Sequence, residues 1–72
     1  MTLSSANSGD HIEIKLISNP IVRAQAIRLG IYEGAVLKCS EKIKNGPIIL
    51  QNRSQELAIG YTLSKSIEIA VI

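Results

Sequence analysis

The feature that most constrains the fold is a strict alternation of apolar and polar residues over residues 10–16 (DHIEIKL). Successive side chains of a β-strand point to opposite faces, so this period of two predicts a half-buried strand. Its buried face is expected to carry Ile12, Ile14 and Leu16. Residues 67–71 repeat the alternation and predict a second strand of the same kind.

The apolar composition supports a sheet. The chain has 72 residues, which is room for one domain. Hydrophobic residues make up 46% of it, yet Phe and Trp are absent and Tyr32 and Tyr61 are its aromatic residues. Isoleucine is the commonest residue. Because β-branched side chains suit a pleated, half-buried surface, this composition favours strands over helices.

One short helix is predicted from Pro20 to about Leu29. Asn19 is a good N-cap, and proline at the first helical position loses no hydrogen bond. Gly30 follows where a helix needs a residue that tolerates positive φ, and Ile31 can close a Schellman motif. The apolar stripe of this helix comprises Val22, Ala26 and Leu29.

The rest of the chain predicts further short strands separated by turns. The strands are expected at residues 35–42, 48–51, 56–60 and 67–71, with polar turns at 45–47 and 52–55 and a turn or single helical twist at 62–66. Together with the strand at 11–16, this order predicts a mainly β fold: a mostly antiparallel, five-stranded sheet curled into a small barrel with one inserted helix. Residues 1–8 show no periodicity and are expected to be a disordered tail, which leaves one domain over residues 9–72.

No catalytic set is evident. Cys39 has His11 as its one possible imidazole partner, and alternation places the two side chains on opposite faces of their strands. Cys39 is therefore interpreted as a buried, inert thiol on the same face as Leu37. Gly30 and Gly34 are spaced as a helix cap and a turn, so they do not form a phosphate loop. We predict that the chain is not an enzyme and has no cofactor.

Metal binding is the weak alternative. Asp10, His11 and Glu13 are close in sequence, and His11 and Glu13 share a strand face, so they could hold a divalent transition metal weakly. A dedicated site takes three or four ligands from several elements. The favoured interpretation is a solvated polar face.

Charge and hydropathy bound the location and the partners. Eight basic and six acidic residues are scattered along the chain, a pattern that does not indicate nucleic acid as a partner. No apolar run is long enough to span a bilayer, and the first residues lack the pattern of a signal peptide. We therefore expect a soluble, cytoplasmic protein that does not insert into a membrane. What remains is protein interaction: Ile21 and Ile27 lie off the helix stripe, and exposed aliphatics of this kind mark a binding patch if they cluster.

The order of these signals resembles the FeoA family. The most specific piece is the Arg-x5-Leu-Gly-Ile-x2-Gly run from Arg23 to Gly34. The resemblance extends from Gly9 to Val71, and its other matching segments are Gly9-Asp10, Gly46-Pro47-Ile48, Leu57-Ala58-Ile59 and Ile67-Glu68-Ile69. The chain departs from the family pattern with Glu33 where proline is common, Arg53-Ser54 where glycine is usual, and Gly60-Tyr61 where a basic residue often follows.

This resemblance implies an SH3-like barrel and a role as a cytoplasmic accessory of bacterial ferrous iron transport. The implied partner is the membrane transporter FeoB, through its cytoplasmic G-protein domain. The alternative is a transition-metal-binding regulator, or an SH3-like module of a metal-dependent system such as the DtxR-type repressors. For the accessory role, the residues expected to contact the partner are Arg23, Ile27, Ile31 and Tyr32.

Overall fold

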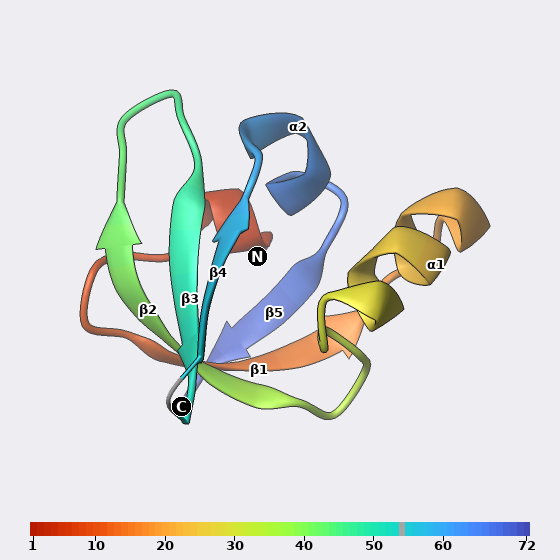
Figure 1. The fold of residues 1–72 in the computed structure, drawn as a ribbon, viewed down its shortest axis with the longest axis horizontal. Helices are drawn as coiled ribbons and strands as arrows, with labels where there is room; N and C mark the ends of the chain where they lie inside the picture. Colours follow the sequence, from red (N-terminus) through yellow and green to blue (C-terminus); the bar gives the residue numbers. More distant parts are fainter. Residues whose placement is uncertain (54) are drawn as a thin grey trace.

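The computed structural model describes residues 1–53 and 55–72 and contains five strands and three helical segments (Figure 1). The strands are β1 (His11–Leu16), β2 (Val36–Lys42), β3 (Ile48–Asn52), β4 (Gln55–Ile59) and β5 (Glu68–Val71). The helical segments are the 3-10 turn η1 (Leu3–Ser5), the helix α1 (Pro20–Arg28) and the short helix α2 (Tyr61–Ser64). No helix in this described part of the chain is long and apolar enough to cross a membrane.

The five strands form one antiparallel sheet in the order β4-β3-β2-β1-β5. The sheet is strongly curled, so side chains of its two end strands, Ile59 of β4 and Ile69 of β5, join the same core cluster (Figure 1). The predicted mainly β, SH3-like fold with one inserted helix is confirmed. The predicted turn at 52–55 includes Ser54, which lies outside the described residues.

The core is almost entirely aliphatic. Ile14, Leu50 and Ile59 are each fully buried, and Ile, Leu and Ala supply the rest of the cluster except for Cys39. Ser64 is buried among them, and its hydroxyl donates to the Tyr61 carbonyl at 2.6 Å. Since the core has no aromatic side chain, branched aliphatics must fill the barrel by interdigitating.

The pairing of β1 with β5 contains an irregularity that corrects one prediction. The register shifts between Ile14 and Leu16, which inserts one extra residue into the period-two pattern. As a result Leu16 is 43% exposed, and Ile17 takes the buried place at 1% exposed. The prediction that Leu16 shares the buried face of Ile12 and Ile14 is therefore wrong.

Residues 1–8 are packed against the barrel rather than frayed, which corrects the prediction of a disordered tail. The Leu3 amide donates to the Ile67 carbonyl at 2.8 Å, and the Ile69 amide donates to the Met1 carbonyl at 2.8 Å. Leu3 and Ala6 are fully buried in the core. The outer edge of β5 offers unpaired backbone groups, and this segment satisfies them while contributing two apolar side chains.

Candidate functional site

Helix α1 begins and ends as the sequence predicts. The Asn19 side chain accepts hydrogen bonds from the amides of Ile21 at 2.9 Å and Val22 at 3.2 Å, which caps the first turn. At the other end the Ile31 amide donates to the Ala26 carbonyl at 2.9 Å, and Gly30 lies at a φ of 81°. This is the Schellman motif predicted for Gly30 and Ile31.

The same helix buries little of its apolar surface. Ala26 is buried and Val22 is half-buried, but Leu29, the third residue of the predicted stripe, is 38% exposed. Ile21 and Ile27 are 70% and 56% exposed. Helix α1 therefore presents two large aliphatic side chains to solvent, beyond what the barrel uses.

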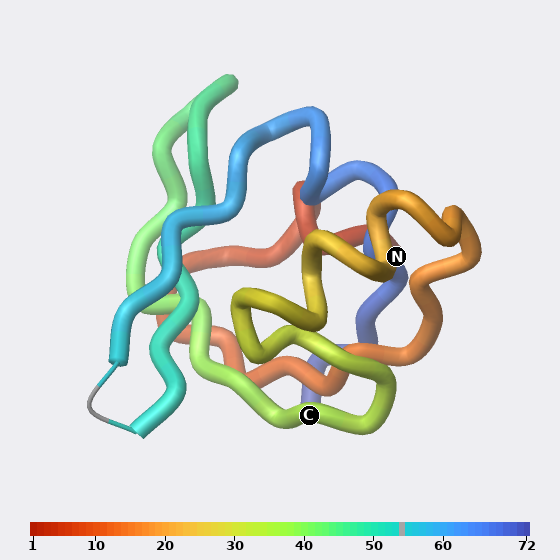
Figure 2. Tube along the Cα trace, turned by 45° about the vertical axis from the view of Figure 1, so that its right-hand side comes forward, coloured from red at the N-terminus to blue at the C-terminus, as the bar shows by residue number. Residues whose placement is uncertain are grey.

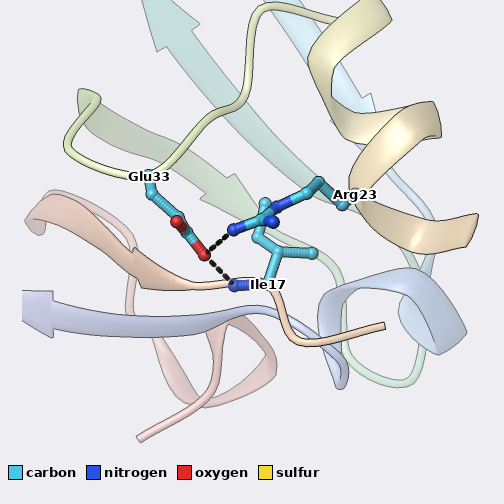
Figure 3. Close-up of polar contacts among 3 residues, drawn as sticks. All are labelled: Ile17, Arg23 and Glu33. Carbon is cyan, nitrogen blue, oxygen red and sulfur yellow. Dashed lines mark hydrogen bonds and ion pairs between the residues drawn. The ribbon is translucent and has the colours of Figure 1, made fainter. Parts of the chain in front are cut away.

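A carboxylate fixes the position of this helix on the barrel. Glu33 lies in the turn between α1 and β2. Its carboxylate accepts a hydrogen bond from the Ile17 amide at 3.1 Å and forms an ion pair with Arg23 of α1 at 2.6 Å (Figure 3). Figure 2 shows the path that makes this possible: the chain leaves β1, passes through α1 and returns beside the end of β1. One side chain thus joins the end of β1, the helix and the returning turn.

Both partners favour the charged form of this carboxylate. The backbone amide of Ile17 first, and the Arg23 guanidinium second, hold the pKa of Glu33 below its ordinary value near 4.5. Sequence reasoning missed this contact, because 16 residues separate Ile17 from Glu33. The available signal was that an acidic residue stands at position 33, where the family commonly has proline.

Of the four residues predicted to contact a partner, three are exposed and one is buried. Ile27 and Tyr32 are each 56% exposed, and the Arg23 side chain is 48% exposed while paired with Glu33. Arg23 and Ile27 lie one helical turn apart on one flank of α1. Ile31 is fully buried, because the Schellman motif turns its side chain into the core. Ile31 as a contact residue is thus a prediction that the structure contradicts.

The weak metal candidates do not gather into a cluster. The Asp10 carboxylate accepts from the Asn7 amide at 2.9 Å, and Glu13 forms an ion pair with Lys15 at 3.1 Å. In residues 1–53 and 55–72, no three His, Cys, Asp or Glu side chains come close enough together to hold a metal ion. A metal ion bound by His11 together with Asp10 or Glu13 would have to displace these contacts of the two carboxylates. Weak metal binding by these three residues stays a prediction.

Cys39 is fully buried, and burial is the main reason that its thiol pKa is raised. His11 lies exposed on β1, so the predicted separation of the two side chains is confirmed. A buried thiol that holds its proton is a poor nucleophile. This arrangement does not provide a thiol–imidazole pair.

A comparison with protein families matches the FeoA domain model over residues 1–71. The chain belongs to the FeoA domain family. Among solved structures, a crystal structure of an iron uptake regulatory protein (FeoA) is similar with a TM-score of 0.90 and 25% identity, over 100% of this chain and 97% of that one. The FeoA protein from Chlorobium tepidum is similar with a TM-score of 0.82 and 27% identity, over 100% of this chain and 70% of that one.

More distant structures share the fold of this FeoA domain. ScaR with bound Zn²⁺ is similar with a TM-score of 0.89 at 16% identity, over 100% of this chain and 37% of that one. At this identity the likeness establishes the fold alone. No curated protein matches the sequence significantly.

Proposed function

We propose that this FeoA domain is a non-enzymatic, cytoplasmic accessory of bacterial ferrous iron transport that binds the G-protein domain of a FeoB-type transporter. Membership of the FeoA family implies an accessory role in ferrous iron transport. The similar crystal structure at 25% identity is described as an iron uptake regulatory protein, which agrees with that role. The partner and the mode of action are the proposed part.

The observation that carries the proposal is the exposed surface of α1 and the turn after it. We call this the α1 surface and define it by Arg23, Ile27 and Tyr32. Ile27 and Tyr32 are each 56% exposed, which is more than Leu16, Leu29 or Ile43. Tyrosine and arginine are among the residue types that dominate binding energy at protein interfaces.

The chemistry of the remaining side chains supports an interaction role over catalysis. The nucleophile that the chain offers, Cys39, is buried and its pKa is raised. The Glu33 carboxylate is held ionised by its two partners, so it is poorly suited to accept a proton at neutral pH. The exposed α1 surface is suited to contact with another protein.

The test is a titration of the chain with the cytoplasmic G-protein domain of the transporter, with and without guanine nucleotide. We expect saturable binding, and we expect Ile27→Ser and Tyr32→Ala each to weaken it about tenfold, which is roughly 1.4 kcal/mol. Ile43→Ser is the matched control, because Ile43 is 46% exposed at the β2–β3 turn, on the other side of the molecule from α1 (Figure 1).

Two outcomes would contradict the proposal. The first is no binding of the G-protein domain in either nucleotide state. The second is an equal loss of binding in Ile43→Ser, which would indicate non-specific apolar association rather than contact through the α1 surface.

A further inference from the structure

A second surface, which shares no residue with the α1 surface, is hollow and lined by lysines. The β2–β3 turn and α2 lie at the same end of the molecule, with η1 below them (Figures 1 and 2). Together with the end of β2, these three segments border an open surface cavity of about 250 Å³. Its lining residues are Ser4, Lys42, Lys44, Asn45 and Tyr61. We refer to it as the lysine cavity.

Among residues 1–53 and 55–72, neither lysine of the cavity takes part in an ion pair. The ion pairs among the described residues use Lys15 and Arg23, so Lys42 and Lys44 belong to neither of them. A third ammonium group is close: Lys65 Nζ lies 4.8 Å from the centre of the Tyr61 ring. Because like charges gathered at one concave surface repel each other, an anion bound there would relieve that repulsion.

The β2–β3 turn, which carries two of the five lining residues, is fixed by its backbone geometry. The Gly46 amide donates to the Ile43 carbonyl at 2.9 Å, and Asn45 adopts a left-handed conformation at a φ of 56°. A Cβ at position 46 would lie 3.0 Å from the Ile43 side chain, so glycine allows the close approach. This geometry places the backbone of Lys44 and Asn45 beside the cavity, and their exposed side chains line it.

The lining is rich in hydrogen-bond donors. Two ammonium groups, the Asn45 amide and the Tyr61 hydroxyl can all donate, and each also tolerates solvent when the site is empty. Ser4 shares a hydrogen bond of 2.7 Å with the Thr2 hydroxyl, in which either oxygen can be the donor. A compact cavity with several donors suits a tetrahedral oxyanion better than an extended acidic peptide, which needs a groove.

We propose that the lysine cavity binds a phosphate group of a small molecule. This inference goes beyond the proposed function and does not depend on it, since none of the lining residues belongs to the α1 surface. The phosphate group comes either from inorganic phosphate or from a phosphorylated metabolite such as a nucleotide. Tyr61 is 42% exposed and offers a ring beside the phosphate position.

The experiment is an NMR titration of the isotope-labelled full chain at low salt with inorganic phosphate, adenosine monophosphate and a triglutamate peptide. We expect saturable shifts at the amides of Lys44, Asn45 and Tyr61, with a dissociation constant on the order of 1 mM for phosphate. Lys44→Gln should weaken phosphate binding about tenfold. The matched control is Lys38→Gln, an exposed lysine of β2 outside the cavity, which should leave binding unchanged.

The ligand arms distinguish the source of the phosphate. Tighter binding of adenosine monophosphate than of phosphate supports a nucleotide ligand, and equal binding supports recognition of the phosphate group alone. The proposal is overturned if phosphate gives no saturable shifts at about 10 mM, a concentration well above the expected dissociation constant. Equal weakening by Lys38→Gln, or tighter binding of the triglutamate peptide than of phosphate, also overturns it.

Discussion

Leu50 in β3 and Leu29 at the end of α1 are residues of the same type in two different surroundings. Leu50 is fully buried in the barrel core, whereas Leu29 is 38% exposed. The barrel is held by close-packed aliphatic side chains, whose stabilisation is insensitive to pH. Helix α1 contributes only Ala26 to that core, with Val22 packed against it. The Glu33 carboxylate adds polar contacts with Ile17 and Arg23. The part of the molecule that presents the α1 surface thus combines little apolar burial with a pH-dependent polar contact.

The largest expected effect comes from breaking the barrel. Leu50→Ala removes a fully buried side chain and should cost about 2–5 kcal/mol, because it leaves a cavity in a packed core. Leu29→Ala should cost less than about 1 kcal/mol, since that side chain is already partly exposed. Urea unfolding of the two variants measures the difference. If the two variants lose similar free energies of unfolding, the barrel and α1 do not differ in how much they depend on apolar burial.

The helix cap should matter at an intermediate level. Asn19→Ala removes the acceptor for the amides of Ile21 and Val22 and should cost about 1 kcal/mol. Thermal unfolding followed by circular dichroism measures this loss. Asn7→Ala, at another exposed asparagine, is the control and should change stability by less than about 0.5 kcal/mol. If Asn19→Ala and Asn7→Ala change the stability equally, the Asn19 cap does not stabilise α1.

The Glu33 contacts should make the helix position depend on pH. The pKa of Glu33 is lowered in the folded chain, so its contribution is fully present above the ordinary value near 4.5. It is lost as the pH falls through the lowered folded value. The Ile17 amide resonance should therefore shift with the titration of this carboxyl, and Glu33→Gln should abolish that shift. Glu56→Gln, at an exposed glutamate of β4, should leave it in place. A pH-independent Ile17 resonance in the unmodified chain would argue against the contact.

Removing an exposed isoleucine from α1 should have little effect on folding. Ile27→Ser replaces a side chain that is 56% exposed, so the free energy of unfolding should change by less than about 0.5 kcal/mol. Urea unfolding is the measurement. A cost comparable with that of Leu50→Ala would mean that Ile27 belongs to the core, and its use as a binding residue would lose its basis.

The smallest effect is expected from metal at the outer face of β1. Any binding of a divalent ion by Asp10, His11 and Glu13 is expected to be weak, because two of them already have partners within the chain. At a metal concentration equal to the dissociation constant, stability should rise by only about 0.4 kcal/mol. A ferrous or zinc titration that follows His11 by NMR measures the affinity. Saturation at micromolar metal would make metal binding a principal property of the chain.

Much of the fold could be predicted because its signals are local. The strand alternation, the Asn19 cap and the Gly30 end of the helix each depend on a few adjacent residues, and all three are present in the structure. The misplacement of Leu16 arose from an irregularity in the pairing with β5, which β1 alone does not encode. The packing of residues 1–8 likewise depends on β5, more than 60 residues away.

The candidate site was less predictable, because it depends on contacts between distant segments. Exposure of Ile27 followed from its position off the apolar stripe of the helix. Burial of Ile31 agrees with the hydrophobic contact that a Schellman motif makes, so the motif itself argued against Ile31 as a partner contact. The lysine cavity unites residues from three elements, and the scattered lysines of the sequence gave no sign of it.

The pairing of residues 1–3 with β5 has a consequence for self-association. An open strand edge is a template on which another chain can add, and proteins usually cover or interrupt such edges. Here the backbone of Met1 and Leu3 occupies hydrogen-bonding positions at Ile67 and Ile69. Displacing these first residues would uncover the backbone edge of β5 and withdraw the fully buried Leu3 from the core at the same time. Exposure to aggregation through β5 and loss of core stability would therefore arise together.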